Sequence, residues 1–461
     1  MLYPNDIEQK LGFDKIRALL QNHCSGERGK DNVDKIRFSS NKPLLLKLCR
    51  QSGEFMKLYQ AGESIPSLHY PKIDESLAKL NVIGVFLETD EIVDISKTLR
   101  ILVDWIGFLH NRQEQYPELA TLSQHVDIDP MLIKKIEACI DEKGEIKSSA
   151  SPELRKIRTE IQKNEGIARK TLDRVMRETR KSDMSPEDSS LTIRNGRLVM
   201  PVKSEYKRSV KGFIHDASSS GNIIFIEPAE VLEINNDLKE LSYSEKREII
   251  RILTRLSDEL RAYVPAISHG DKFLGIVDLI KAKALLSLDF DALVPELNTR
   301  HAFNWKAAVN PILKKALVKQ GKTLVPLDVR LDEQNRVLLI SGPNAGGKSV
   351  CLKTVGLLHY MYQCGIPVSL REGSTVTIFN NIFIDIGDEQ SIEDDLSTYS
   401  SHLKAMDFFI KHTDKNTLFL IDEFGSGTDP QFGGAIAEAI LEQLTTSKGM
   451  GIITTHYNNL K

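Results

Sequence analysis

Eight residues between Gly342 and Ser349 have the types and order needed to bind the phosphates of a nucleotide. They read Gly-Pro-Asn-Ala-Gly-Gly-Lys-Ser, which is typical of a phosphate-binding loop. An apolar run at 337–340 precedes the loop and a helix-like stretch at 350–358 follows it. Glycines let backbone N–H groups approach phosphate oxygens, and the following helix N-terminus attracts negative charge. We expect Lys348 to contact the β- and γ-phosphates of ATP and Ser349 to bind Mg²⁺. The residues expected to contact the nucleotide are Gly342, Pro343, Asn344, Ala345, Gly346, Gly347, Lys348, Ser349 and Val350.

Two adjacent carboxylates, Asp422 and Glu423, follow a second apolar run at 418–421. Such a run predicts a central parallel strand, and its carboxyl end faces the crevice where α/β folds bind ligands. We expect Asp422 to hold Mg²⁺ and Glu423 to polarise the attacking water. The alternative for the pair is a strand that simply ends in a solvated acidic turn.

A third apolar run at 451–455 ends at His456, and the stretch at 397–402 is rich in hydroxyls and enters a helix. A histidine at a strand end can sense a γ-phosphate, and a hydroxyl-rich helix N-terminus can bind a second face of a triphosphate. Taken singly, His456 could be a core histidine and the serines could be helix caps. The order of all these segments favours the nucleotide site.

That order resembles the ABC-type ATPases, and the motifs themselves resemble the MutS family. Several segments are similar to the bacterial MutS-two branch, whose members lack the mismatch-reading domain. The segments that carry the resemblance are 149–155, 192–197, 201–203, 215–221, 342–349, 386–392, 397–402, 422–430 and 455–457. The resemblance therefore covers almost the whole chain.

The resemblance implies a homodimer in which two subunits sandwich the nucleotides. In that arrangement Ser397, Thr398 and Ser400 would serve the phosphates bound by the partner's loop. Gln390 matches the glutamine-containing segment of the family, and Asp429 matches the dimer-interface aspartate. The residues assigned to catalysis are Lys348, Glu423 and His456.

Family members continue well beyond the position that matches Lys461, commonly into a small nuclease domain. We therefore expect a fragment that ends within or just after the ATPase domain. Nuclease activity is not expected of it, the dimer is expected to be weakened, and ATP binding is a safer expectation than turnover.

A basic region precedes the nucleotide motifs. Between residues 151 and 211 there are 16 Lys and Arg against 9 Asp and Glu, although the whole chain has a net charge of −3. Apolar residues at helical spacing predict one long helix at 151–176 and another at 234–256. Between them, Asn195-Gly196 predicts a β-hairpin, with further strands at 212–216 and 223–227. The resemblance implies two lever helices that carry a small β clamp around nucleic acid.

The clamp is expected to contact the backbone phosphates of DNA, branched or duplex, with little sequence preference. The alternative for its charges is an ordinary solvated sheet face. The candidate contacts are Arg194, Arg197, Lys203, Lys207, Arg208 and Lys211.

The predicted fold is multidomain, with an all-α core and long lever helices that carry the β clamp, followed by an α/β ABC-type ATPase domain. The expected domains are an N-terminal helical core at 1–130, a first lever region at 131–185, the clamp at 186–232, returning lever helices at 233–300 and the ATPase domain at 301–461. A chain of 461 residues is long enough for several such domains.

Composition excludes several classes of protein. Hydrophobic residues make up 41% of the chain and charged residues 27%, and no apolar stretch of about 20 residues could span a membrane. The five cysteines form neither a disulfide framework nor a zinc motif. We expect a cytoplasmic protein, associated with the nucleoid or with ribosomes, whose cofactors are ATP and Mg²⁺.

Three functions fit these observations. The leading interpretation is a clamp that acts on branched or recombining DNA and suppresses homologous recombination, as the resemblance implies. The second is an ATPase that binds rRNA on stalled or collided ribosomes. The third is a non-catalytic scaffold, which Glu423 argues against. A transporter motor is disfavoured because the Leu-Ser-Gly-Gly-Gln signature is missing from the sequence.

Overall fold

The computed structural model describes residues 1–186, 189–342, 347–387, 398–425, 430–457 and 460. The chain forms two compact units, each built from separate stretches of sequence. Unit 1 comprises Met1–Lys72, Ile101–Asp127 and His269–Lys461, and unit 2 comprises Ile73–Arg100 and Ile128–Ser268. Helix α6 (Thr89–His110) contributes residues to both units. Within the described residues, no helix is long and apolar enough to cross a membrane.

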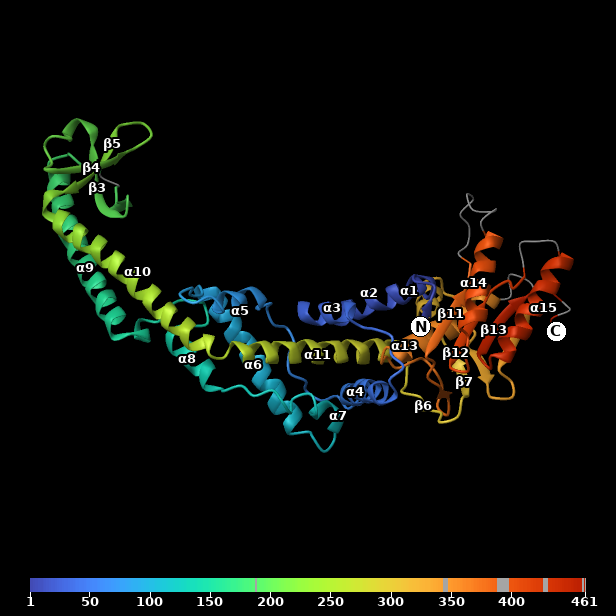
Figure 1. The fold of residues 1–461 in the computed structure, drawn as a ribbon. Coiled ribbons are helices and arrows are strands. Elements are labelled where there is room, and N and C mark those ends of the chain that lie inside the picture. Colours follow the sequence, from blue (N-terminus) through green and yellow to red (C-terminus); the bar gives the residue numbers. More distant parts are fainter. Residues whose placement is uncertain (187–188, 343–346, 388–397, 426–429, 458–459, 461) are drawn as a thin grey trace. The chain divides into compact units, whose positions relative to one another are not determined.

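Unit 1 contains a five-stranded parallel sheet in the order β1-β11-β12-β13-β9 (Figure 1). Its strands are β1 (Leu2–Tyr3), β9 (Val337–Ser341), β11 (Asn381–Asp385), β12 (Thr417–Ile421) and β13 (Met450–Thr455). The three strands predicted from apolar runs, β9, β12 and β13, are confirmed. Strand β1 pairs with Ile382 and Phe383, so the N-terminus lies in the same sheet, whereas the sequence led us to expect a separate helical domain at 1–130.

Strands of this sheet are apolar on both faces because both faces are covered by helices. Along β12, Leu418 and Leu420 belong to a core shared with α13 (Lys348–Gln363). The alternate residues Phe419 and Ile421 belong to a second core shared with α14 (Thr398–His412) and α15 (Pro430–Thr446). This period of two explains why the strand reads as one continuous apolar run.

Helix α13 is packed tightly against the sheet and the N-terminal helices. A Cβ added at Gly356 would lie 2.5 Å from Leu11 and 2.9 Å from Leu420, so a larger residue would have to displace these two leucine side chains. The other helices of unit 1 are α1 (Ile7–Leu11), α2 (Phe13–His23), α3 (Glu27–Asp34), α4 (Lys42–Gln60), α7 (Pro117–Ala120), α11 (Val264–Asp289) and α12 (Pro311–Lys319). A second sheet, in the order β6-β10-β7-β8, consists of β6 (Glu296–Leu297), β10 (Thr375–Val376), β7 (Phe303–Ala308) and β8 (Leu327–Leu331).

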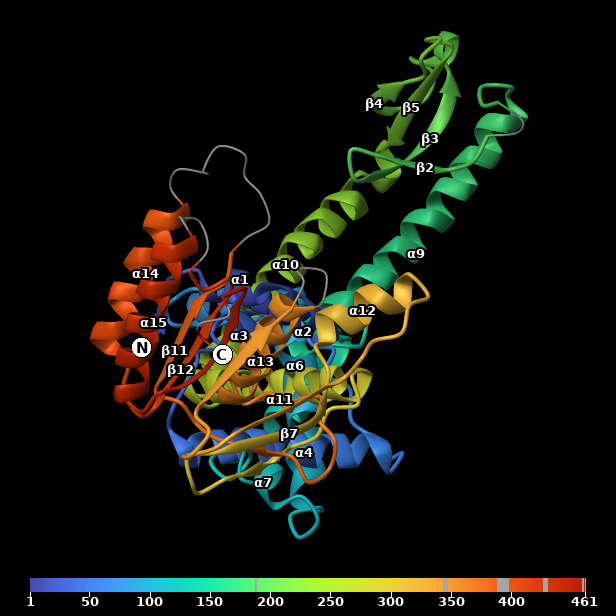
Figure 2. The ribbon, with the colours of Figure 1, turned by 90° about the vertical axis from the view of Figure 1, so that its right-hand side faces the viewer.

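Unit 2 consists of helices with a small sheet at one end (Figure 2). Helices α9 (Pro152–Lys181) and α10 (Leu232–Arg261) confirm the two predicted long helices and pack against each other. Helix α9 begins at Pro152, where the Ser151 hydroxyl accepts a hydrogen bond from Leu154 N, as expected for an N-cap. The other helices are α5 (Asp74–Leu80), α8 (Met131–Cys139), η1 (Ser148–Ala150), η2 (Ser204–Tyr206) and η3 (Ala229–Val231).

The clamp sheet, as we call the four antiparallel strands of unit 2, has the order β2-β3-β5-β4. Its strands are β2 (Thr192–Arg194), β3 (Arg197–Lys203), β4 (Gly212–Ala217) and β5 (Ile223–Pro228). The predicted hairpin is confirmed, because Arg194 pairs with Arg197 and both turn residues, Asn195 and Gly196, have positive φ angles of 53° and 73°. Such angles characterise a two-residue hairpin turn.

Candidate functional site

The predicted nucleotide residues gather where four parallel strands of unit 1 end. In the sheet register, Thr455 lies opposite Ser341, and Ile421 lies opposite Asp385. Asp422 and His456 follow directly, so the last residues of β9, β11, β12 and β13 share one edge. We call this the carboxyl edge. Ligands of open parallel sheets bind at such an edge.

Lys348 connects the phosphate loop to the end of β13. It is the first residue of α13, after Gly347 with a φ of 80°, and its side chain is 5% exposed. Its ammonium donates a 2.7 Å hydrogen bond to the Gly342 carbonyl and lies 3.0 Å from His456 Nε2. The described part of the loop therefore brings together two of the predicted catalytic residues, Lys348 and His456.

Asp422 and Glu423 are fixed by Thr454 on the neighbouring strand. The Thr454 hydroxyl donates a 2.5 Å hydrogen bond to Asp422 Oδ1 and accepts one of 2.8 Å from Glu423 N. Asp422 is 6% exposed and Thr454 fully buried. Glu423 has a φ of 47°, an unfavourable conformation for a residue with a Cβ, and such strain clusters at functional sites. Thr454 could not be predicted as a site residue from the sequence, because a buried threonine in a strand belongs to no motif.

His402 and Asp385 form a second polar pair at the carboxyl edge. His402 Nδ1 lies 2.6 Å from Asp385 Oδ2. The hydrogen bond to Asp385 raises the pKa of His402 above its ordinary value, and the charges of Asp385 and Glu423 act in the same direction. His402 was predicted only as part of a motif, without a role of its own, and Asp385 was not predicted as a site residue, because their contact depends on the fold.

The oxygen donors at this edge fit Mg²⁺, which prefers carboxylate and hydroxyl ligands and is usually held by only one or two carboxylates together with substrate phosphates. Ser349 lies in the first turn of α13 and Asp422 at the end of β12. Within the described residues, no three His, Cys, Asp or Glu side chains form a preassembled metal cage.

Several predicted residues lie outside the described part of the chain. These are Pro343, Asn344, Ala345, Gly346, Gln390, Ser397 and Asp429. Of the neighbouring predictions, Thr398 is the first residue of α14 and Ser400 is exposed on it. Val350 is 41% exposed in α13. The roles given to all these residues stay predictions.

The six basic residues predicted to bind nucleic acid fall into two groups. Arg194 pairs with Asp216 at 3.1 Å, Arg197 with Glu227 at 2.7 Å and Lys203 with Asp183 at 2.7 Å. Lys207, Arg208 and Lys211 are exposed, and none of them pairs with a carboxylate of the described residues. The first group holds the clamp together, whereas the second carries uncompensated positive charge.

Glu227 is the centre of the strongest polar network in the clamp sheet. It is 1% exposed, and its carboxylate contacts Arg197 Nη1, His215 Nε2 and Asn235 Nδ2, each at 2.7 Å. Asn235 lies on α10, so the network fastens β3, β4 and β5 to that helix. A buried carboxylate is stable only with such partners. A count of charges along the sequence could not show that Arg197 pairs with a buried carboxylate of the protein itself.

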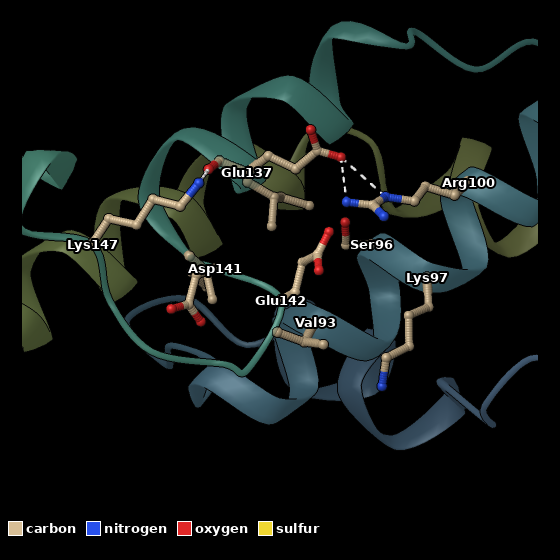
Figure 3. A pocket seen from close by; sticks show the side chains of 10 residues that line it. Val93, Ser96, Lys97, Arg100, Glu137, Asp141, Glu142 and Lys147 are labelled. Carbon is tan, nitrogen blue, oxygen red and sulfur yellow. Dashed lines mark hydrogen bonds and ion pairs between the residues drawn. The ribbon is translucent and has the colours of Figure 1, made fainter.

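A cavity of about 600 Å³ in unit 2 lies between α6 and α8. Figure 3 shows Arg100 and Glu137 facing each other across it. Their side chains are 2.6 Å apart, and Lys147 donates to the Glu137 carbonyl at 2.6 Å. None of the predicted site residues lines this cavity. The charges of Arg100 and Glu137 are already paired with each other. It is therefore a poor candidate for the chemistry expected from the sequence.

Comparison with known proteins gives a consistent result. Residues 338–461 match the family model described as MutS domain V. The chain is 37% identical over 454 residues to a protein named Endonuclease MutS2 from Geobacillus sp. strain WCH70, covering 98% of this chain and 57% of that protein. Proteins of the same name from Enterococcus faecalis and Halothermothrix orenii are each 35% identical, over 98% of this chain and 56% and 57% of theirs. The chain thus spans little more than half the length of these relatives.

Proposed function

Because the chain belongs to the MutS family, and within it to the MutS2 branch, we propose that it is a Mg²⁺-dependent ATPase that controls a nucleic-acid clamp. The proposed target is branched or recombining DNA, and the proposed result is suppression of homologous recombination. The observation that carries the ATPase part is the convergence of Lys348, Asp422, Glu423 and His456 at one edge of a parallel sheet.

In this proposal each side chain has a separate task. Lys348 exchanges its Gly342 and His456 contacts for the β- and γ-phosphates of ATP. Ser349 and Asp422 hold Mg²⁺, which neutralises phosphate charge when bound. Glu423, on its strained backbone, orients the attacking water, and His456 stays close enough to Lys348 to respond to the γ-phosphate. Ser397, Thr398 and Ser400 of a second copy complete the site, with Asp429 at the dimer interface and Gln390 in the glutamine-containing segment of the family.

The clamp part of the proposal rests on Lys207, Arg208 and Lys211, because these exposed cations carry no internal ion pair within the described residues. Neutralising the phosphates of a duplex releases counterions, so binding should weaken steeply with salt. Contacts of this kind read the backbone rather than the base sequence. ATP binding by two copies would close the clamp around the strand.

The nucleotide site is tested by the melting temperature with and without Mg-ATP. Lys348→Ala should abolish the stabilisation that the wild-type chain gains from the bound nucleotide. Lys353→Ala, on the same helix, is the matched control and should keep it. An equal shift in Lys348→Ala and wild type would contradict the assignment.

The clamp is tested by measuring the affinity for four-way junction DNA, duplex DNA and ribosomes at several salt concentrations. Charge reversal in Lys207→Glu with Arg208→Glu should weaken DNA binding and reduce its salt slope by about two. Identical slopes would exclude these contacts. Preference for ribosomes over both DNAs at one salt concentration would favour the ribosomal alternative instead.

A further inference from the structure

A groove of about 500 Å³ runs along the last turns of α9, beside the segment that leads into β2. It is lined by Arg169, Asp173, Met176, Arg177, Arg180, Ser189, Ser190 and Leu191. None of these residues was predicted from the sequence to be a binding residue. The helix presents its apolar residues to α10 and the clamp sheet, so the arginines on the opposite face are left at the surface.

The groove carries uncompensated positive charge of its own. Arg169, Arg177 and Arg180 are all exposed, and none pairs with a carboxylate of the described residues. Arg177 donates to the Asp173 carbonyl at 3.1 Å, and Arg180 donates to the Ser189 carbonyl. Both contacts orient the guanidinium groups, but their acceptors are backbone carbonyls, which do not neutralise the positive charge. Among the described residues that line the groove, three cations against Asp173 leave a net charge of about +2.

The opposite flank of the same helix has a different character. The hollow there, about 380 Å³, contains Lys211 together with Glu178 and Glu230. Two carboxylates against one lysine leave the lining of this hollow less positive than that of the arginine groove. The two flanks therefore differ in charge although they share one helix, and the arginine groove is the side suited to phosphate.

We propose that this groove binds the phosphodiester backbone of a nucleic-acid strand. The proposal rests on the clamp function above and extends its contact surface from the clamp sheet onto α9. Arg169 and Arg180 are separated by roughly 16 Å along the helix axis at 1.5 Å per residue, enough to meet two or three phosphates of one strand. Met176 and Leu191 give the groove an apolar floor, which suits the sugars between phosphates and would not favour a free inorganic ion.

Arginine is the appropriate residue for such a site because its planar guanidinium binds phosphate with two parallel hydrogen bonds. The contacts carry no base information, so affinity should depend on backbone charge and on salt. Duplex DNA and duplex RNA of equal length present the same phosphodiester chemistry in different helical geometries. Comparing them identifies which duplex the groove accepts.

The test uses the full 461-residue chain and fluorescently labelled 20-base-pair duplexes of DNA and of RNA, titrated at 50–200 mM salt. Arg169→Gln with Arg177→Gln should weaken binding about tenfold and reduce the salt slope by about two. The matched control, Arg155→Gln with Lys163→Gln, removes two exposed charges from the same helix outside the groove. It should leave the slope nearly unchanged, and circular dichroism should show both variants folded. Inorganic pyrophosphate should compete only weakly.

Equal slopes for the groove variant and its control would overturn the groove as a binding site. If Lys207→Glu with Arg208→Glu reduces the slope while the groove variant does not, the groove proposal fails and the clamp function stands. If the wild-type chain binds neither duplex, both fail together. Strong competition by pyrophosphate would also overturn the proposal, because it would indicate a site for a small anion.

Discussion

The hydroxyl of Thr454 joins Asp422 through a hydrogen bond of 2.5 Å. The same oxygen accepts from Glu423 N, so one threonine on β13 holds both the carboxylate of Asp422 and the backbone of Glu423 at the end of β12. Both Thr454 and Asp422 are buried, and a hydrogen bond to a buried charge contributes more than one between neutral groups.

Thr454→Val should therefore destabilise the protein and disturb the nucleotide site together. The substitution keeps the shape but removes the hydroxyl that donates to Asp422 and accepts from Glu423 N, at a cost of about 2 kcal/mol in the free energy of unfolding. Denaturant titration measures this, and the Mg²⁺ concentration needed for ATP-dependent stabilisation should rise. Thr159→Val, exposed on α9, is the control and should change stability by less than about 0.5 kcal/mol. An unchanged Mg²⁺ requirement would separate Thr454 from the metal site.

Glu423→Gln should separate binding from hydrolysis. The amide keeps the side chain's size but cannot accept a proton, so ATP turnover should fall by about a hundredfold or more. The melting shift with Mg-ATP should persist, because the phosphates are expected to be bound by Lys348 and Ser349. Phosphate release assays and thermal shifts on the same preparation give both values. Loss of the shift together with turnover would indicate that Glu423 serves binding and not water activation.

The burial of His359 predicts that the protein loses stability in acid. It is fully buried on α13 among Phe303, Trp305 and Phe379, and this burial lowers its pKa from 6.5 to about 3. In the unfolded chain the histidine takes up a proton below pH 6.5, whereas in the folded chain it does not. Stability is therefore complete above pH 6.5 and is lost progressively as the pH falls towards 3.

By pH 5 this single histidine should cost about 2 kcal/mol of unfolding free energy, at 1.36 kcal/mol per pH unit. His359→Leu removes the titrating group and should flatten the decline between pH 6.5 and 5, even if its stability at pH 7.5 is lower. The exposed His125→Gln should follow the wild-type curve. Parallel curves for His359→Leu and wild type would show that the buried imidazole does not titrate on unfolding.

Two glycines should respond oppositely to the same substitution. A Cβ at Gly451 would lie 1.9 Å from the Phe419 ring on the paired strand, so Gly451→Ala should destabilise unit 1 by about 3 kcal/mol. Gly166 lies on the exposed side of α9 with nothing within 4 Å of such a Cβ, so Gly166→Ala should stabilise unit 2 by about 1 kcal/mol. Calorimetric melting profiles test both. A higher melting temperature for Gly451→Ala would contradict this prediction, because it would mean that β12 and β13 can move apart at little cost in free energy.

The sequence predicted those parts of the fold whose signal is local. The apolar runs that became β9, β12 and β13, the long helices α9 and α10, and the turn at Asn195 each depend on a few neighbouring residues. Strand β1 was missed because Leu2–Tyr3 has no periodicity, and it pairs with residues some 380 positions away. The contact between His402 and Asp385 was missed for the same reason, because only the folded sheet brings α14 to the end of β11.

Arg197 in the clamp sheet is another residue whose contacts could not be predicted from the sequence, and its role can be tested. Its guanidinium is 17% exposed and bonds the buried carboxylate of Glu227 as well as Asn236 Oδ1. Arg197→Gln would leave Glu227 without its main counter-charge, and breaking a buried pair from one side costs about 3–5 kcal/mol. The variant should therefore unfold the clamp sheet at lower denaturant concentration. Where it remains folded, its DNA salt slope should match that of wild type, because the guanidinium serves the protein and not the phosphate. A slope lower by about one, with stability unchanged, would instead assign Arg197 to the nucleic acid.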